Sequence, residues 1–321
     1  MKIENASELI VSKEYVREPV DKAVNKILES KKRRIILSGN RGTGRTTVLH
    51  ALQNRGLGTK EQTIYMHPDA IIFMSKEPTE QFNEELFDYV YEQNFAHSIL
   101  CYIKRNYPLT YEKYFKKDKE ALSKAIDEFD EQLNNCWYIE TTFKTSKEPE
   151  KILKRTLYKM YDKLNIDKLN IAIDKFDSIN GSSQYAQKVL EKNFHWFDKT
   201  IIVSDDPRLS KRKLTDPEDY DIAKLTYGKN KDVLREIIKR RAEEDEKKLA
   251  IYTRDDVIEK LANLGDNIRF KLKVLAYVDR IIDREEEIDD IEKLFDSAIK
   301  RNEEDAKKLQ KMLPKKTRLY L

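Results

Sequence analysis

A glycine-rich segment between residues 39 and 46 has the residue types that bind phosphate. It reads GNRGTGRT and fits the pattern GxxxxGK[ST] at every position except the lysine, where Arg45 stands. Glycines let such a loop curl so that backbone N–H groups face the phosphates, and the following helix adds the positive end of its dipole. An ordinary glycine turn before a helix is the alternative. The predicted phosphate-binding residues are Gly39, Asn40, Arg41, Gly42, Thr43, Gly44, Arg45, Thr46 and Thr47.

A carboxylate that could complete this site follows a second apolar run. In LNIAIDKFDSI, Asp174 comes after four residues of which three are apolar. We therefore expect it at the carboxyl end of a parallel strand, where ligands bind in sheets of this kind. Thr46 and Asp174 are the candidate ligands of Mg²⁺ for a bound ATP, and Asp177 is a second carboxylate close by. A strand-end aspartate can also be only a helix cap.

Strand-like and helix-like segments alternate around these residues. Ile35 to Leu37 is a short apolar run before the glycines, and TTVLHALQNRG after them has the pattern of a helix that ends at Gly56. Residues 62–66 with 70–73, 169–173 and 200–203 also have strand character. Strand, loop, helix and strand in this order are typical of a doubly wound α/β domain with a parallel sheet.

Two helical regions accompany this predicted α/β base. Residues 75–163 contain long helical stretches with many tyrosines and phenylalanines, which we expect to form core rather than to stack on bases. Beyond Pro217 the pattern becomes purely helical, which predicts a lid. The predicted organisation is an α/β base over 1–215 that includes the helical insertion, a helical lid over 216–283, and a charged helix with a basic tail over 284–321.

The amino-acid composition limits the classes of protein to which this chain can belong. A chain of 321 residues is long enough for one large and one small domain, and its 62 Lys and Arg nearly balance 58 Asp and Glu, so any surface for nucleic acid must be local. Two cysteines without CxxC spacing and four scattered histidines predict no structural metal. No signal peptide and no long apolar run are visible, so we expect a soluble, cytoplasmic protein without membrane contact.

Taken together, these stretches resemble the origin-recognition-complex and helicase-loader branch of the AAA+ ATPases. The resemblance covers about residues 12 to 283 and is strongest in the phosphate loop. The stretches that carry it are YVREPVDKAVNKIL with its Arg17 and Glu18, GNRGTGRT, IDKFDSI, IVSDD, LTYGKNKDVLREIIKRR and GDNIR. It implies a P-loop NTPase that binds ATP and Mg²⁺.

The resemblance assigns further roles, and two of them fall on altered residues. Where the family has a glutamate that orients the attacking water, this chain has Lys175, and Arg45 replaces the loop lysine. The implied polar sensor after the next strand is Asp205, with Ser204 as second choice, and Arg269 is the implied lid arginine. A capped turn and an exposed arginine are the plainer alternatives. The resulting catalytic set is Asp174, Lys175, Asp177, Asp205 and Arg269.

These residues predict that ATP is bound better than it is hydrolysed, because a charged lysine cannot accept a proton from water. The resemblance implies a nucleotide-switched assembly or recruitment factor on DNA. Candidate DNA-binding clusters are Lys31 to Arg34, Arg208 with residues 211–213, and residues 235–241, which could equally be solvated helix faces. The family's winged-helix domain is not expected, because only about 40 residues follow Asp283.

A second function class stays open. Similar fragments occur in regulatory ATPases of antiphage-defence systems and of transposition, which act through protein partners, and fold analogy does not separate the two classes. The segment KKLQKMLPKKTRLYL from Lys307 is basic with an apolar end, which suits docking of a partner protein or nucleic-acid backbone unless it is merely solvated. Homo- or hetero-oligomers are expected from the family, with Arg208, Arg212 or Arg240 as the arginine finger.

Overall fold

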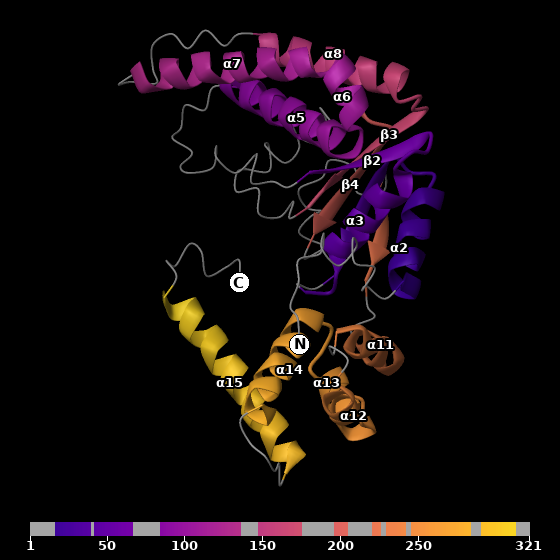
Figure 1. The fold of residues 1–321 in the computed structure, drawn as a ribbon, viewed down its shortest axis with the longest axis vertical. Helices are drawn as coiled ribbons and strands as arrows, with labels where there is room; N and C mark the ends of the chain where they lie inside the picture. The colour runs from indigo at the N-terminus through magenta and orange to yellow at the C-terminus, as the bar shows by residue number, and fades with distance from the viewer. Residues whose placement is uncertain are drawn as a thin grey trace.

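Five parallel strands form the central sheet of the α/β base in the computed structural model (Figure 1). The structure describes residues 17–39, 42–66, 84–135, 147–174, 196–204, 220–225, 229–241, 245–283 and 290–312. The strands are β1 (Arg34–Ser38), β2 (Glu61–Met66), β3 (Lys168–Ile173), β4 (Lys199–Ser204) and β5 (Tyr220–Lys224). Their order across the sheet is β2-β3-β4-β1-β5, so that β4 separates β1 from β3.

Apolar residues cover both faces of the inner strands. In β1, Ile35 and Leu37 pack into one core while Ile36, which lies between them, packs into the core on the opposite face. This alternation follows from the two-residue period of a strand. Strands buried on both faces are near-continuous apolar runs, as parallel sheets require. The predictions of strands at 35–37, 62–66, 169–173 and 200–203 are confirmed, and residues 70–73 lie outside the described part of the chain.

Two helices cover one face of the sheet. They are α2 (Arg17–Glu29) and α3 (Arg45–Gly56), which pack on each other, α2 against β5 and α3 against β2, and share a core with Ile35 and Leu37 of β1 (Figure 1). Their buried side chains are mostly aliphatic and come from positions three and four apart, as in Val20, Val24 and Ile27 of α2. The predicted helix after the glycine-rich segment is therefore confirmed, including its end at Gly56.

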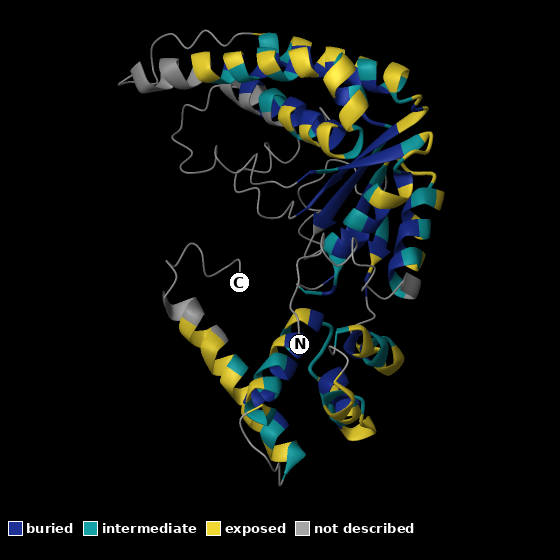
Figure 2. Ribbon diagram, viewed as in Figure 1, coloured by how far each residue is buried: buried dark blue, intermediate teal, exposed yellow. Residues whose placement is uncertain are grey.

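The opposite face is covered by helices inserted between β2 and β3. They are α5 (Glu84–Asn106), α6 (Pro108–Tyr114), α7 (Lys116–Asn135) and α8 (Glu148–Lys163). Aromatic side chains of this insertion, among them Phe95 and Phe115, are buried in one core with residues of the sheet. Figure 2 shows the buried residues of these helices in dark blue. The prediction that most of these aromatic residues form core is confirmed. Residue 75, the expected start of the insertion, lies outside the described residues.

The expectation of a purely helical chain beyond Pro217 was wrong. Strand β5 lies after this point and pairs with β1 at the edge of the sheet, from Arg34 opposite Tyr220 to Ser38 opposite Lys224. The sheet therefore continues beyond residue 215. A strand at the edge of a sheet is less buried and needs fewer apolar residues. In YDIAK, apolar and polar residues do not alternate clearly enough to predict a strand.

Helices alone follow the sheet in the remaining described residues. The lid consists of α11 (Lys231–Arg241), α12 (Glu246–Tyr252), α13 (Asp255–Asn263) and α14 (Ile268–Ile282), which enclose their own apolar core. The charged helix α15 (Ile291–Met312) joins that core through Phe295 and Ala298, and its next turns are mostly exposed (Figure 2). Within the described residues, no helix has the length and apolarity needed to cross a membrane.

Candidate nucleotide-binding site

Glycines shape the loop that follows β1. Gly42 and Gly44 adopt φ angles of 77° and 90°, in the left-handed region that costs other residues energy. Gly39 is closely surrounded, because a Cβ atom added there would lie 2.8 Å from Thr43 Oγ1 and 3.3 Å from Leu225 Cβ. The backbone path thus requires glycine at three of the predicted positions. Asn40 and Arg41 lie outside the described residues.

Helix α3 begins at the end of this loop. Its N-cap is Gly44, which has no side chain to cap the first N–H groups, and its first turn contains no acidic residue. The positive end of the helix dipole is therefore left for an anion. Arg45 is the first residue of the helix and adds a cation there. Thr43 and Thr47 are buried, so their side chains support the loop from within.

Thr46 and Asp174 meet as the sequence predicted. The Thr46 hydroxyl donates a hydrogen bond of 2.8 Å to Asp174 Oδ2. Asp174 follows β3 directly, is only 2% exposed, and donates its backbone N–H to the Met66 carbonyl. A hydroxyl and a carboxylate are the hard oxygen ligands that Mg²⁺ takes from proteins when phosphates and water complete its octahedron. The pair therefore fits the expected ion.

Two residues of this site were missed by the sequence analysis. The Tyr65 hydroxyl donates to the same Asp174 Oδ2 at 3.1 Å, and the His50 ring lies over Tyr65 with centroids 4.3 Å apart. Burial lowers the pKa of His50, Asp174 opposes this shift, and Arg105 adds to it. Tyr65 is the second-last residue of β2, which neighbours β3, so its position at a carboxyl strand end was the available signal.

The lid touches the phosphate loop at Gly42. The N–H groups of Ile268 and Arg269, the first two residues of α14, lie 3.1 and 3.4 Å from the Gly42 carbonyl oxygen. Asn267 caps this helix by accepting from the Phe270 N–H at 2.9 Å. A Cβ atom on Gly42 would overlap the Asn267 side-chain oxygen and lie 3.1 Å from Arg269 Cβ. The structure thus brings exposed Arg269 beside the loop.

A buried lysine lies one turn further along α14. Lys271 is 1% exposed, and burial lowers its pKa to about 8, with Asp266 opposing the shift and Lys229 adding to it. Nothing in the sequence analysis singled it out, because a lysine among apolar residues of an amphipathic helix is usually assigned to the wet face. Its burial places a second cation of α14 near the junction of lid and base.

The structure does not describe several of the other predicted site residues. Lys175, Asp177 and Asp205 lie outside the described residues, and Ser204 is described only as the last residue of β4. Within the described part of the chain, no group of three or more His, Cys, Asp or Glu side chains could hold a metal ion. The Mg²⁺ assignment therefore rests on the contact between Thr46 and Asp174.

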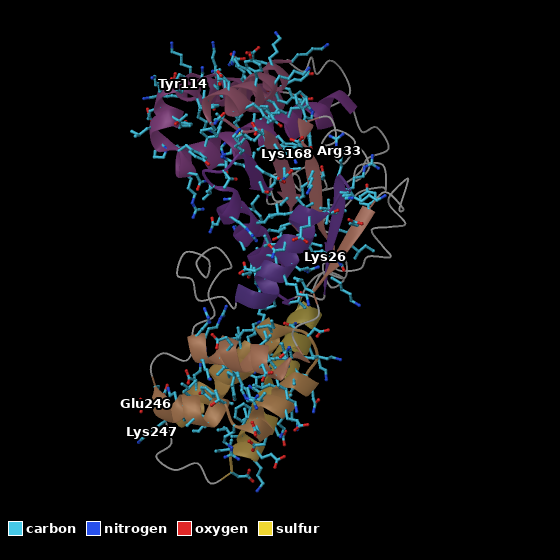
Figure 3. The ribbon with its side chains drawn as sticks, turned by 90° about the vertical axis from the view of Figure 1, so that its right-hand side faces the viewer. Lys26, Arg33, Tyr114, Lys168, Glu246 and Lys247 are labelled. Atoms are coloured by element: carbon cyan, nitrogen blue, oxygen red, sulfur yellow. The ribbon has the colours of Figure 1, made fainter. Side chains whose placement is uncertain are left out.

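Several arginines of the predicted DNA clusters already contact other groups of the protein. Arg33 donates to the carbonyl oxygens of Phe197 and Asp198. Figure 3 labels Arg33, which directly precedes β1, and Lys168, the first residue of β3. Arg235 pairs with Asp232 and Asp255, and Arg240 pairs with Glu236. Arg208, Arg212 and residues 211–213 and 313–321 lie outside the described residues.

No protein-family model matches the chain, and no curated protein matches its sequence. The interpretation of the site therefore depends on the geometry of the loop, of Asp174 and of the lid helix.

Proposed function

We propose that this protein binds ATP with Mg²⁺ at the junction of base and lid, hydrolyses it slowly, and uses the bound nucleotide to control assembly on DNA. The observation that carries the proposal is the hydrogen bond between Thr46 and Asp174 beneath a glycine-rich loop. These two residues are 128 positions apart in the sequence. Their meeting at the start of a helix and the end of a strand supports a nucleotide site over a chance glycine turn.

The arrangement of the sheet supports the AAA+ resemblance. The loop strand β1 and the Asp174 strand β3 have one strand between them, and a helical lid follows the sheet in the sequence. Asp174 still contacts Thr46, the second residue of α3. The lid helix then reaches the loop through Gly42, which is the contact that a nucleotide-dependent switch needs.

Each described residue has a role in this proposal. The N-terminus of α3 and the Arg45 guanidinium bind the phosphates, and Thr46 and Asp174 hold Mg²⁺, which neutralises phosphate charge when bound. Arg269 reaches the phosphates from the lid. Because the Gly42 carbonyl accepts from the first turn of α14, a shift of the loop around phosphate moves α14 directly. The lid position then reports the nucleotide state.

Slow hydrolysis follows from the residue after Asp174. Lys175 cannot serve as a base while it is charged, and loss of a positioned base typically lowers a rate by about 10² to 10⁴. Phosphate release and nucleotide binding should be measured on the wild type, Lys175→Glu and Asp174→Ala. A suitable control is Asp167→Ala, which removes an exposed carboxylate just before the opposite end of β3.

We expect the wild type and the three variants to differ in ATP binding and phosphate release. The wild type and Asp167→Ala bind ATP and release phosphate well below the ordinary enzyme range of roughly 1 to 10³ s⁻¹. Lys175→Glu gains turnover, and Asp174→Ala loses the dependence of binding on Mg²⁺. Wild-type turnover within the ordinary range would refute impaired hydrolysis, and absence of ATP binding at millimolar nucleotide would refute the site itself.

The DNA part of the proposal is tested separately. Fluorescence titrations with DNA at about 50 mM salt, where phosphate contacts are strong, should show binding in at least one nucleotide state. Absence of binding in both states would remove DNA from the proposal. A partner lost when residues 307–321 are deleted would then favour a regulatory protein of a defence or mobile-element system. Sedimentation with and without ATP and Mg²⁺ tests oligomerisation, and a monomer at micromolar concentration in both conditions would contradict it.

A further inference from the structure

The helical insertion is electrically polarised along its length. Residues 104–119 and 155–163 contain nine cationic and three acidic side chains, whereas residues 84–92 and 127–135 contain eight acidic and no cationic side chains. We name the first two segments the basic end of the insertion. The asymmetry is invisible in the nearly balanced composition of the whole chain, and it creates the local surface that polyanion binding requires.

Contacts between helices hold the charges of each end together. The Asp118 carboxylate of α7 pairs with Arg155 and Lys159 of α8, both at 2.8 Å, which joins the two segments of the basic end. The Tyr89 hydroxyl of α5 donates to the Ala125 carbonyl of α7 at 2.9 Å, near the acidic ends of these antiparallel helices. The separation of charge in the sequence therefore becomes a separation in space.

Aromatic rings are interleaved with the cations of the basic end. Lys113 and Lys163 lie over the Tyr114 ring, with each Nζ atom 5.1 and 5.3 Å from its centroid. Tyr158 and Lys163 lie on the same helix, α8. The Tyr158 residue is 75% exposed, which is unusual for a large side chain on a packed helix. Cations beside an exposed aromatic ring are the combination used to bind single strands, and here Tyr158 supplies the exposed ring on the same helix as Lys163.

Besides buried Asp118, the basic end has two acids, and both lie at the surface. Lys116 pairs with Glu112 and Lys163 with Asp162, but these side chains are 38 to 57% exposed, and such pairs contribute about 0 to 1 kcal/mol. A phosphate can therefore replace these carboxylates at little cost. Lys117 is exposed and forms no ion pair with another described residue.

We propose that the basic end of the insertion binds single-stranded DNA, with lysines against the phosphates and a base stacked on Tyr158. This inference rests on the DNA part of the proposed function and gives it a surface that the sequence analysis did not identify. Figure 1 shows the insertion and the lid on opposite sides of the sheet, and Figure 3 shows Tyr114 far from Glu246 and Lys247 of the lid.

Charge reversal tests the phosphate contacts. The test variant carries Lys113→Glu, Lys117→Glu and Lys163→Glu, and the control carries the same three changes at exposed Lys247, Lys273 and Lys300. Fluorescence titrations with an oligothymidylate at several salt concentrations should give a salt slope lower by about 2 in the test variant, from roughly 0.7 per lost phosphate contact, and at least about tenfold weaker binding. The control should change far less, although both variants lose the same net charge.

Replacement of Tyr158 tests the stacking. Tyr158→Ala should weaken oligothymidylate binding about 5- to 100-fold, and Tyr158→Phe should retain it, because the ring face carries the contact. Leu109→Ala is the matched control, since Leu109 is an apolar residue of the same insertion that is 87% exposed. Duplex DNA should bind with little dependence on Tyr158, because paired bases are not available to stack.

The outcomes separate this inference from the proposed function. If the wild type binds DNA and neither the charge-reversal variant nor Tyr158→Ala differs from its control, the surface is wrong while DNA binding stands. If the wild type binds no DNA, both fail, and the ATP titration still decides the nucleotide site. A salt-sensitive dimer that charge reversal abolishes, without any DNA binding, would show that the basic end meets the acidic end of a second copy.

Discussion

Replacement of Gly42 by alanine should uncouple the lid from the phosphate loop. The change acts twice, because Gly42 has a φ angle of 77° and because the new Cβ atom would overlap the Asn267 side chain and approach its Cγ to 2.9 Å. The left-handed backbone costs alanine roughly 1 to 2 kcal/mol. Displacement of Asn267 from its capping position costs about 0.5 to 2 kcal/mol more. We therefore expect Gly42→Ala to lower the free energy of unfolding by about 2 to 3 kcal/mol.

A second glycine separates the two contributions. Gly58 has a similar φ of 73°, but a Cβ atom added there would have no neighbour within 4 Å. Gly58→Ala should therefore show the backbone cost alone, about 1 kcal/mol. In an Asn267→Ala background the overlap with the Asn267 side chain is gone and only the 3.1 Å approach to Arg269 Cβ remains, so the cost of Gly42→Ala should fall towards that of Gly58→Ala, with a coupling energy on the order of 1 kcal/mol.

Urea unfolding followed by circular dichroism measures these differences. A titration with fluorescent ATP on each variant shows whether the lid contact also affects nucleotide affinity. Equal destabilisation by Gly42→Ala and Gly58→Ala, unchanged by Asn267→Ala, would refute the contact between α14 and the loop. The nucleotide-dependent movement of the lid would then lose its physical basis.

Three further predictions concern single side chains. Tyr65→Phe removes one of the hydroxyls that hold Asp174, so the affinity for Mn²⁺, measured by electron paramagnetic resonance, should change severalfold. An unchanged affinity would contradict the positioning role of Tyr65. Lys271 has its pKa lowered to about 8, below its unfolded value near 10.4, so its burial destabilises the fold fully below pH 8. This cost, at most about 3 kcal/mol, should disappear as the pH rises towards 10.4, and urea unfolding of Lys271→Met should lack the rise. Asp118→Ala leaves two partly exposed cations without their carboxylate and should cost about 2 kcal/mol in urea unfolding, and a cost near zero would show that the cluster is not stabilising.

The sequence predicted strands and helices correctly where the pattern of apolar residues was clear. Apolar runs such as Ile35 to Leu37 are unambiguous because a strand buried on both faces tolerates few polar residues. It failed at β5, whose residues from Tyr220 pair with β1 only at the sheet edge.

The sequence predicted the backbone geometry of the loop because its residues have a recognisable local pattern. The spacing of Gly42, Gly44 and Thr46 identified the loop, since each position has a conformational or chemical requirement that few residue types meet. Tyr65 and Asn267 carry no such pattern. Their proximity to the site depends on which strand neighbours β3 and on where α14 meets the loop, and neither is encoded in a short stretch of sequence.

The sequence by itself determined the local conformations: a glycine loop between a buried strand and a helix, and a carboxylate at the end of another strand. Hydrophobic period and glycine backbone freedom act over a few residues, so these features can be read without the fold. Only the tertiary structure decided that Tyr65 contacts Asp174, that α14 contacts Gly42, and that the cations around Tyr114 gather at one end of the insertion. Such contacts between distant residues depend on strand order and helix packing, which are set by the burial of the whole core.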